Sequence, residues 1–123
     1  MREDELHKQV ACYLRYYEKT HKNLKFWTYE PFGEKRPPIT ASLLKAKGTK
    51  RGVPDFQLIF ENKVDKTKSI IMWLECKIGK NKQSLEQKDF ERIIGQFEDQ
   101  YYYLVYDLND LEKVLNFTEF WND

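Results

Sequence analysis

Residues 70–77 read Ile-Ile-Met-Trp-Leu-Glu-Cys-Lys, an apolar run that ends in two charged residues flanking a cysteine. Its β-branched and aromatic side chains predict a buried strand over residues 69–77. Because side chains alternate across a strand, Glu75 and Lys77 share one face and Cys76 points to the other. This strand therefore brings a carboxylate and an ammonium group to one edge of a hydrophobic sheet.

A second motif precedes another strand. Gly52-Val53-Pro54-Asp55 leads into the largely apolar run Phe56–Phe60, which predicts a strand over residues 54–61. Only a short polar turn, residues 62–68, separates the two strands, so we expect an antiparallel hairpin. Asp55 can then join Glu75 at the sheet edge. Carboxylates are costly to bury unless a cation satisfies them, and Mg²⁺ prefers oxygen ligands.

The rest of the chain alternates between helical and extended patterns. Apolar spacing and turn signals predict helices over residues 3–19 and 40–47, a strand over 24–30, a loop over 31–38, a helix beginning after Ser84, a strand over 101–106, and a last helix capped by Asn109 or Asp110. The order α-β-α-β-β-α-β-α predicts an α/β three-layer sandwich, with a central mixed sheet of about four strands flanked by helices. Strand 101–106 should be a parallel neighbour of strand 69–77, reached by a right-handed crossover.

One helix has a clear start signal. Ser84 and Gln87 have the spacing of a capping box. We expect the helix that they open to use one apolar face, formed by Leu85, Phe90, Ile93, Ile94 and Phe97. The tyrosine-rich strand 101–106 suits a buried strand best, with base stacking or a dimer face as alternatives.

Length and composition narrow the class of protein. The 123 residues predict one domain over 1–123, and 41% hydrophobic residues can supply a core. No apolar run approaches a membrane span, and the charged N-terminus lacks a secretory signal pattern. The two cysteines, Cys12 and Cys76, are not expected to pair, and neither fits a zinc-binding Cys/His spacing. We therefore expect a cytoplasmic protein that is neither secreted nor bound to a membrane.

The net charge of +1 hides a strong asymmetry. Residues 34–52 carry six Lys or Arg against one Glu, whereas residues 98–123 carry seven acids against one Lys. The basic segment adjoins the expected carboxylates, where a phosphate backbone would lie. The candidate DNA-binding residues in the adjoining loops are Lys35, Arg36, Lys47, Lys50, Arg51, Lys80 and Lys82.

In this order the motifs resemble the PD-(D/E)XK nuclease superfamily, and within it the VRR-NUC (virus-type replication-repair nuclease) branch. There, basic sequence and Gly-Val-Pro lead into the aspartate, as in residues 45–55 here. Glu-Xaa-Lys is followed by a Gly/Lys loop and Ser-Xaa-Xaa-Gln, as in residues 75–87. Cys76 stands where the family usually has an aliphatic residue. The resemblance covers nearly the whole chain and implies a restriction-endonuclease-like fold of the stand-alone microbial or phage type.

Asp55 and Glu75 are the predicted ligands of Mg²⁺ or Mn²⁺, and the resemblance implies the backbone carbonyl of Cys76 as a third ligand. Lys77 is expected to hold the attacking water or to stabilise the pentavalent phosphate. The alternative reading makes both acids ordinary strand-end residues that pair with lysines. For Lys77 the alternative is a salt bridge to Glu75.

The resemblance also implies roles for two helical residues. Glu5 matches the glutamate that the family places in its first helix, where it would bind a second metal or a metal-bound water. Glu3 could take either role, and a first-turn glutamate also favours the helix dipole without any catalytic role. Gln87 is implied to contact the site or Lys77, besides capping its helix. His7 and His21 are read as solvated.

The implied activity is a Mg²⁺- or Mn²⁺-dependent, structure-selective DNA endonuclease. It would hydrolyse phosphodiester bonds in branched DNA, such as Holliday junctions, as a homodimer without an organic cofactor. No segment has the pattern of a base-reading element. The alternatives are a flap or splayed-arm nuclease, a restriction-type enzyme with a defined sequence site, and a non-catalytic DNA-binding module with a relic site.

Overall fold

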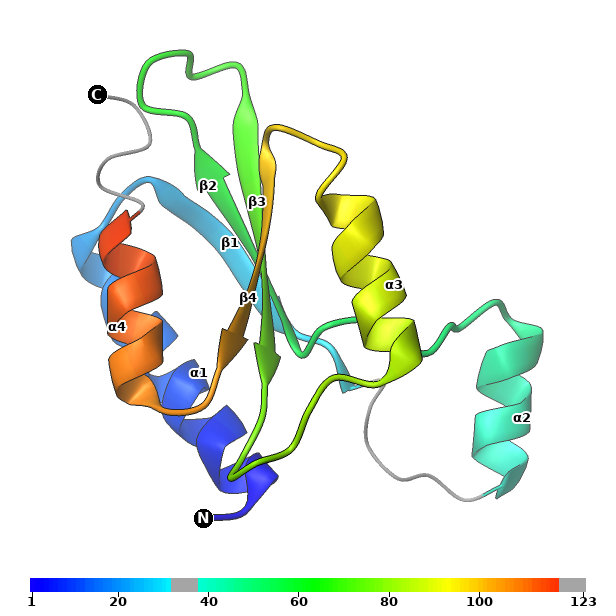
Figure 1. Ribbon diagram of the computed structural model, residues 1–123. Coiled ribbons are helices and arrows are strands. Elements are labelled where there is room, and N and C mark those ends of the chain that lie inside the picture. Colours follow the sequence, from blue (N-terminus) through cyan, green and yellow to red (C-terminus); the bar gives the residue numbers. More distant parts are fainter. Residues whose placement is uncertain (32–37, 118–123) are drawn as a thin grey trace.

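The computed structural model describes residues 1–31 and 38–117 (Figure 1). The elements are α1 (Glu3–Thr20), β1 (Leu24–Tyr29), α2 (Pro38–Ala46), β2 (Phe56–Glu61), β3 (Ser69–Cys76), α3 (Leu85–Ile94), β4 (Gln100–Val105) and α4 (Leu108–Phe117). This is the predicted order. Each predicted strand begins and ends within two residues of the observed one.

The four strands form one mixed sheet in the order β1-β2-β3-β4. Strand β2 pairs antiparallel with β1 and with β3, which confirms the predicted hairpin. Strand β4 pairs parallel with β3, also as predicted. Helices α1 and α4 cover one face of the sheet and α3 lies on the other, so the fold is a three-layer α/β sandwich (Figure 1).

The main core lies between the sheet and helices α1 and α4. Strand alternation sends every second side chain of β2 and β3 into it, including Phe56, Leu58 and Met72, all fully buried. Helix α1 contributes one apolar stripe, formed by Leu6, Val10, Leu14 and Tyr17. Burying each such side chain stabilises the fold by about 1.5–3 kcal/mol, so this layer fixes α1 against the sheet.

The opposite face of the sheet is covered only in part. Helix α3 covers it with Phe90, whose ring lies edge-on to Trp73 with 5.0 Å between centroids. Phe90 is half-buried, and Ile94 is the member of the predicted stripe that is buried. Only part of the predicted apolar face is buried, because α3 lies over the β3–β4 half of this side of the sheet. The exposed members of the stripe are Leu85, Ile93 and Phe97.

The cap of α4 also differs from the prediction. The Asp110 amide donates to Asp107 Oδ1 at 2.9 Å, so Asp107 caps the helix, not Asn109 or Asp110. Asp110 instead accepts a hydrogen bond from the Tyr106 amide at 2.9 Å. The two acids thus satisfy neighbouring amides at the β4–α4 junction.

Helix α2 stands away from the sheet (Figure 1). Within residues 1–31 and 38–117 no other helix or strand packs against it. Both cysteines are unpaired, with Cys12 exposed and Cys76 buried in the core. Over the same ranges, no helix combines the length and apolar character needed to cross a membrane.

Candidate metal centre

The β2–β3 hairpin brings the two predicted carboxylates together. Asp55 directly precedes β2 and Glu75 is the penultimate residue of β3. Because Phe56 pairs with Leu74 in the antiparallel register, both acids lie at the same end of the hairpin. A carboxylate oxygen of each lies within 4.8 Å of the other and of a third, from Glu3 of α1. These carboxylates form the centre of the candidate site.

Asp55 is held as an anion. It is 5% exposed, and its Oδ2 accepts a hydrogen bond from the Cys76 amide at 2.8 Å. His7 Nε2 lies 3.3 Å from the same oxygen. Burial alone would raise the pKa of Asp55, but the contacts with His7, Glu75 and the Cys76 amide outweigh it and bring the pKa below its usual value.

Glu75 has the opposite environment. It is 2% exposed, and burial together with the neighbouring Asp55 raises the pKa of Glu75 to about 10. Its Oε1 is buried without a hydrogen-bond partner in the part of the chain that the structure describes. At neutral pH the metal-free pair therefore shares one proton, with Asp55 charged and Glu75 neutral.

The first-helix acid at the site is Glu3, not Glu5. Glu3 lies in the cluster with Asp55 and Glu75, whereas Glu5 is exposed and does not line the groove described below. Residues two positions apart on a helix are about 200° apart around its axis. Once the core stripe of α1 faces the sheet, Glu3 must point toward the site and Glu5 away from it. The expectation that Glu5 reaches the site is corrected accordingly.

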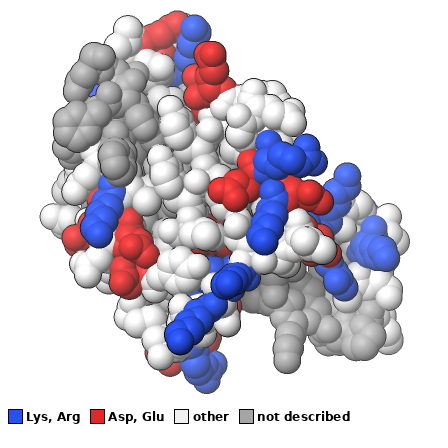
Figure 2. Space-filling model, viewed as in Figure 1, with Lys and Arg blue, Asp and Glu red and all other residues white. Residues whose placement is uncertain are grey.

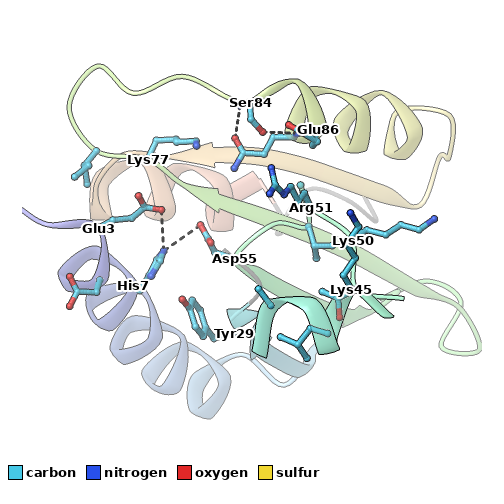
Figure 3. A pocket seen from close by; sticks show the side chains of 18 of the residues that line it. Glu3, His7, Tyr29, Lys45, Lys50, Arg51, Asp55, Lys77, Ser84 and Glu86 are labelled. Atoms are coloured by element: carbon cyan, nitrogen blue, oxygen red, sulfur yellow. Dashed lines mark hydrogen bonds and ion pairs between the residues drawn. The ribbon is translucent and has the colours of Figure 1, made fainter. Parts of the chain in front are cut away.

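His7 is the residue that the sequence analysis missed. The reading of His7 as solvated is wrong, because its side chain is 14% exposed and lies between Glu3 and Asp55 (Figure 3). Its ring also packs against Tyr29, with 5.0 Å between centroids. A signal was present: Glu3 and His7 are one helical turn apart and continue the buried stripe of Val10.

Lys77 extends into the same groove from the residue after β3 and is half-buried (Figure 3). Its positive charge favours the ionised form of Glu75, although burial and Asp55 prevail in the pKa of that group. The implied role of the Cys76 carbonyl stays a prediction. The backbone amide of Cys76, in contrast, already donates a hydrogen bond to Asp55.

Gln87 lines the groove and completes the predicted capping box. The backbone amide of Gln87 donates to Ser84 Oγ at 3.2 Å. The side-chain Oε1 of Gln87 accepts from the backbone amide of Ser84 at 2.8 Å. The structural role of Gln87 is confirmed, and its contact with a substrate or with Lys77 stays a prediction.

The loop before Asp55 is fixed against the first turn of α3. Gly52 has φ of 90°, and a Cβ there would lie 2.5 Å from the backbone oxygen of Glu86. Only glycine accommodates both the left-handed conformation and this close approach. The glycine of the motif therefore sets where Asp55 enters the sheet.

Glu3, His7, Asp55, Lys77 and Gln87 line a groove of about 1760 Å³. Lys45, Lys50 and Arg51 line it between α2 and the loop that leads to Asp55 (Figure 3). Figure 2 shows Lys and Arg side chains over the lower right of the molecule, where α2 lies in the same view, with acidic side chains among them. The groove thus combines a carboxylate centre with a basic border.

The other predicted DNA-binding residues lie elsewhere. Lys47, Lys80 and Lys82 are exposed but do not line the groove. Lys35 and Arg36 lie outside the described residues. The sequence analysis did not name Lys45 as a DNA-binding candidate.

The donor set fits a hard divalent cation. Mg²⁺ and Mn²⁺ bind carboxylate oxygens, and a cation beside Glu75 Oε1 would satisfy a buried oxygen that no described residue satisfies. It would also allow Glu75 to ionise beside Asp55. Comparison of the chain with protein-family models, curated proteins and solved structures finds no match.

Proposed function

We propose that this protein is a metal-dependent endonuclease that hydrolyses phosphodiester bonds in DNA. The observation that carries the proposal is the cluster of Glu3, Asp55 and Glu75 at the edge of a groove with a basic border. A buried carboxylate whose pKa is raised by an ionised neighbour, as that of Glu75 is by Asp55, is unfavourable in its charged form without a cation, so the convergence of these acids supports a binding role over a structural one. Lys77 beside them adds an ammonium group that can stabilise the negative charge on the phosphate in the transition state.

Each group has a task in this proposal. Asp55, Glu75 and Glu3 would hold Mg²⁺ or Mn²⁺, which when bound supplies an acidified water and offsets charge on the phosphate. The Cys76 amide keeps Asp55 charged and oriented through its hydrogen bond. Lys77 donates hydrogen bonds to the attacking water or to the equatorial oxygens of the phosphate as their charge grows.

The basic border would position the DNA. Lys45, Lys50 and Arg51 can each contact a phosphate, which gives sequence-independent and salt-dependent affinity. A site that binds backbone and not base edges suits recognition of DNA shape. We therefore propose branched DNA, such as a four-way junction, as the substrate. A two-fold junction needs two active sites, which a homodimer would supply.

Cleavage of labelled four-way junctions, flaps, splayed arms and linear duplex with Mg²⁺ tests this activity. Glu75→Gln and Lys77→Met should each lower the rate by about 10²–10⁴-fold, as loss of a group that acts in the transition state does. Lys66→Met is the matched control, since Lys66 is exposed in the turn at the far end of the hairpin. It should cleave like the unchanged protein.

Binding with Ca²⁺ in place of Mg²⁺ separates a nuclease from a module that only binds DNA. A nuclease should hold the junction intact with Ca²⁺ and cut it once Mg²⁺ is added. Cleavage by Glu75→Gln and Lys77→Met at the unchanged rate would refute the assignment of the site. A solution mass of one chain for the free protein, together with one chain per junction in the DNA complex, would refute the homodimer.

A further inference from the structure

We propose that His7, Asp55 and Cys76 form a second cation site that takes Zn²⁺, and that Zn²⁺ bound there inhibits the nuclease by occupying Asp55. The inhibition rests on the proposed function. The binding of zinc does not.

The three side chains come from three different elements. His7 belongs to α1, Asp55 precedes β2 and Cys76 ends β3. They bring one nitrogen, one oxygen and one sulfur atom within 4.8 Å of one another. Tetrahedral zinc, with bonds of about 2.0–2.3 Å, needs its ligands about 3.5 Å apart. His7 Nε2 and Asp55 Oδ2, at 3.3 Å, already meet that spacing. The sulfur needs an approach of about 1 Å at most, on the same bond lengths.

The donor types separate this site from the carboxylate centre. Thiolate and imidazole ligands select Zn²⁺, whereas Mg²⁺ takes oxygen ligands. Strand alternation places Glu75 and Cys76 on opposite faces of β3, so the oxygen donor and the sulfur donor diverge. Asp55 reaches both sides, since it interacts with Glu75 and accepts the Cys76 amide hydrogen bond. The two sites therefore share Asp55, while Glu75 belongs to the carboxylate centre and Cys76 to the zinc site.

The surroundings supply the rest of a zinc site. Glu3 Oε1 lies 3.7 Å from His7 Nε2 and is placed to act as a fourth donor. His7 and Asp55 line the groove, which gives the ion a path from solvent, while Cys76 is fully buried beneath them. A sulfur shielded from water behind an accessible imidazole and carboxylate allows an ion to enter from the groove and be held tightly.

Metal-dependent shifts in melting temperature test the binding, because a ligand that binds only the folded state stabilises it by mass action. The protein is titrated with Zn²⁺ and, separately, with Mg²⁺ in a reducing buffer free of chelators. Cys76→Ala keeps the backbone amide and carbonyl and should weaken Zn²⁺ binding at least tenfold while weakening Mg²⁺ binding far less. Glu75→Gln should lose the Mg²⁺ shift and keep the Zn²⁺ shift. Cys12→Ala, which removes the exposed cysteine, is the matched control and should keep both.

Co²⁺ provides a spectroscopic readout independent of activity. Cobalt bound at this site should show a thiolate-to-metal charge-transfer band that is present in Cys12→Ala and absent in Cys76→Ala. His7→Asn serves as a second variant if Cys76→Ala does not fold, and it should weaken Zn²⁺ binding without removing the thiol. Equal Zn²⁺ affinity in the unchanged protein and both variants, or cobalt without the band, overturns the site.

The consequence for cleavage is tested separately. Zn²⁺ should inhibit Mg²⁺-dependent cleavage by the unchanged protein and inhibit Cys76→Ala at least tenfold less. Zinc bound through Cys76 in a protein that does not cut DNA would leave the zinc site standing and refute the nuclease. Mg²⁺-dependent cleavage that Zn²⁺ inhibits equally in Cys76→Ala would refute the inhibitory role and leave the nuclease standing.

Discussion

Asp55 and Glu75 carry the same functional group in the same corner of the sheet, but their surroundings treat them in opposite ways. The Cys76 amide and His7 stabilise charge on Asp55. Glu75 faces that charge with a buried oxygen that lacks a hydrogen-bond partner among the described residues. In the metal-free protein Asp55 is therefore ionised and Glu75 stays protonated.

The first prediction concerns Glu75→Gln in the absence of metal. Glutamine cannot ionise, and its amide can donate to Asp55. At pH 7 the glutamate of the unfolded chain is ionised and must take up a proton to fold, whereas glutamine does not, so the variant should be more stable than the unchanged protein by about 1–3 kcal/mol. Urea unfolding in EDTA measures this difference. A variant less stable than the unchanged protein at pH 7 would contradict it.

The same difference should depend on pH in a defined direction. The pKa of Glu75 is about 10 in the folded state against 4.5 in the unfolded chain. Between these values the folded state binds more protons, so the stability of the unchanged protein falls as pH rises. The advantage of Glu75→Gln should be absent below pH 4.5 and grow above it.

Asp55→Asn is the matched comparison and should act in the opposite direction. The pKa of Asp55 is lowered in the fold, so its charge contributes stability above its unfolded value of 3.8, and that stability is lost as pH falls. Asp55→Asn should destabilise the metal-free protein at pH 7. Urea unfolding in which both variants stabilise the fold would contradict the assignment of the shared proton.

Residue-level prediction succeeded where strand geometry constrains side chains and failed where helix docking decides. Asp55 and Glu75 were placed together because a short hairpin and an alternating strand leave few other arrangements. Glu5 was preferred over Glu3 because a sequence match fixes a neighbourhood and not the face of a helix. His7 was read as solvated because its partner Asp55 lies 48 residues away in the chain.

The loop from α2 to β2 links the position of Asp55 to the position of α3. Gly52 rests on the backbone of Glu86 in the first turn of α3, while three residues later Asp55 enters the site. The N-terminus of α3 therefore limits where the carboxylate can lie.

Gly52→Ala should destabilise the protein by about 2–5 kcal/mol, from left-handed strain plus overpacking. Gly48→Ala separates the two causes, because Gly48 also has positive φ, 98°, but an added Cβ meets nothing within 4 Å. It should cost only about 1–2 kcal/mol. Equal losses in urea unfolding would show that the contact with Glu86 is unimportant.

Ser84→Ala should cost about 1 kcal/mol, because it removes the side chain that accepts the Gln87 amide at the start of α3. Ser69→Ala, at an exposed position that begins β3, is the control and should change stability by less than about 0.5 kcal/mol. Thermal unfolding of both variants checks the difference. A Ser84→Ala protein as stable as the control would mean that the capping box adds nothing.

Element-level prediction identified each helix and strand of residues 1–31 and 38–117, but not how much of each is covered. The periodicity of α3 is genuine, yet Leu85 and Ile93 are exposed because the helix lies over only half of its sheet face. Periodicity reports which side chains share a face. The extent of the opposing surface is a property of the assembled sheet, which no local window contains.

At the scale of the whole molecule, the separation of charge along the chain becomes a separation in space. The basic segment that ends at Gly52 borders the groove and includes α2, and the acidic segment includes α4, which lies across the molecule from α2 (Figure 1). The three-layer architecture could be predicted because helices and strands alternate along the chain. The position of α2 could not, because no described element packs against it.

Salt dependence tests the DNA surface as a whole. Lys50→Ala and Arg51→Ala should each lower the slope of log affinity against log salt concentration by about 1, since each removes one phosphate contact. Lys66→Ala should leave the slope unchanged. Binding of junction DNA with Ca²⁺ over a range of salt concentrations gives the slopes. Unchanged slopes for both groove variants would place the DNA elsewhere.

The alternation of β3 also restricts how the gene can evolve. A substitution alters one face of the strand, whereas insertion or deletion of a single codon within Ile70–Leu74 would exchange both faces and send Glu75 into the core. Length changes should be tolerated instead in the turn formed by residues 62–68, at the far end of the hairpin. Homologues of this protein should therefore vary in length at that turn and keep the spacing of residues within β3.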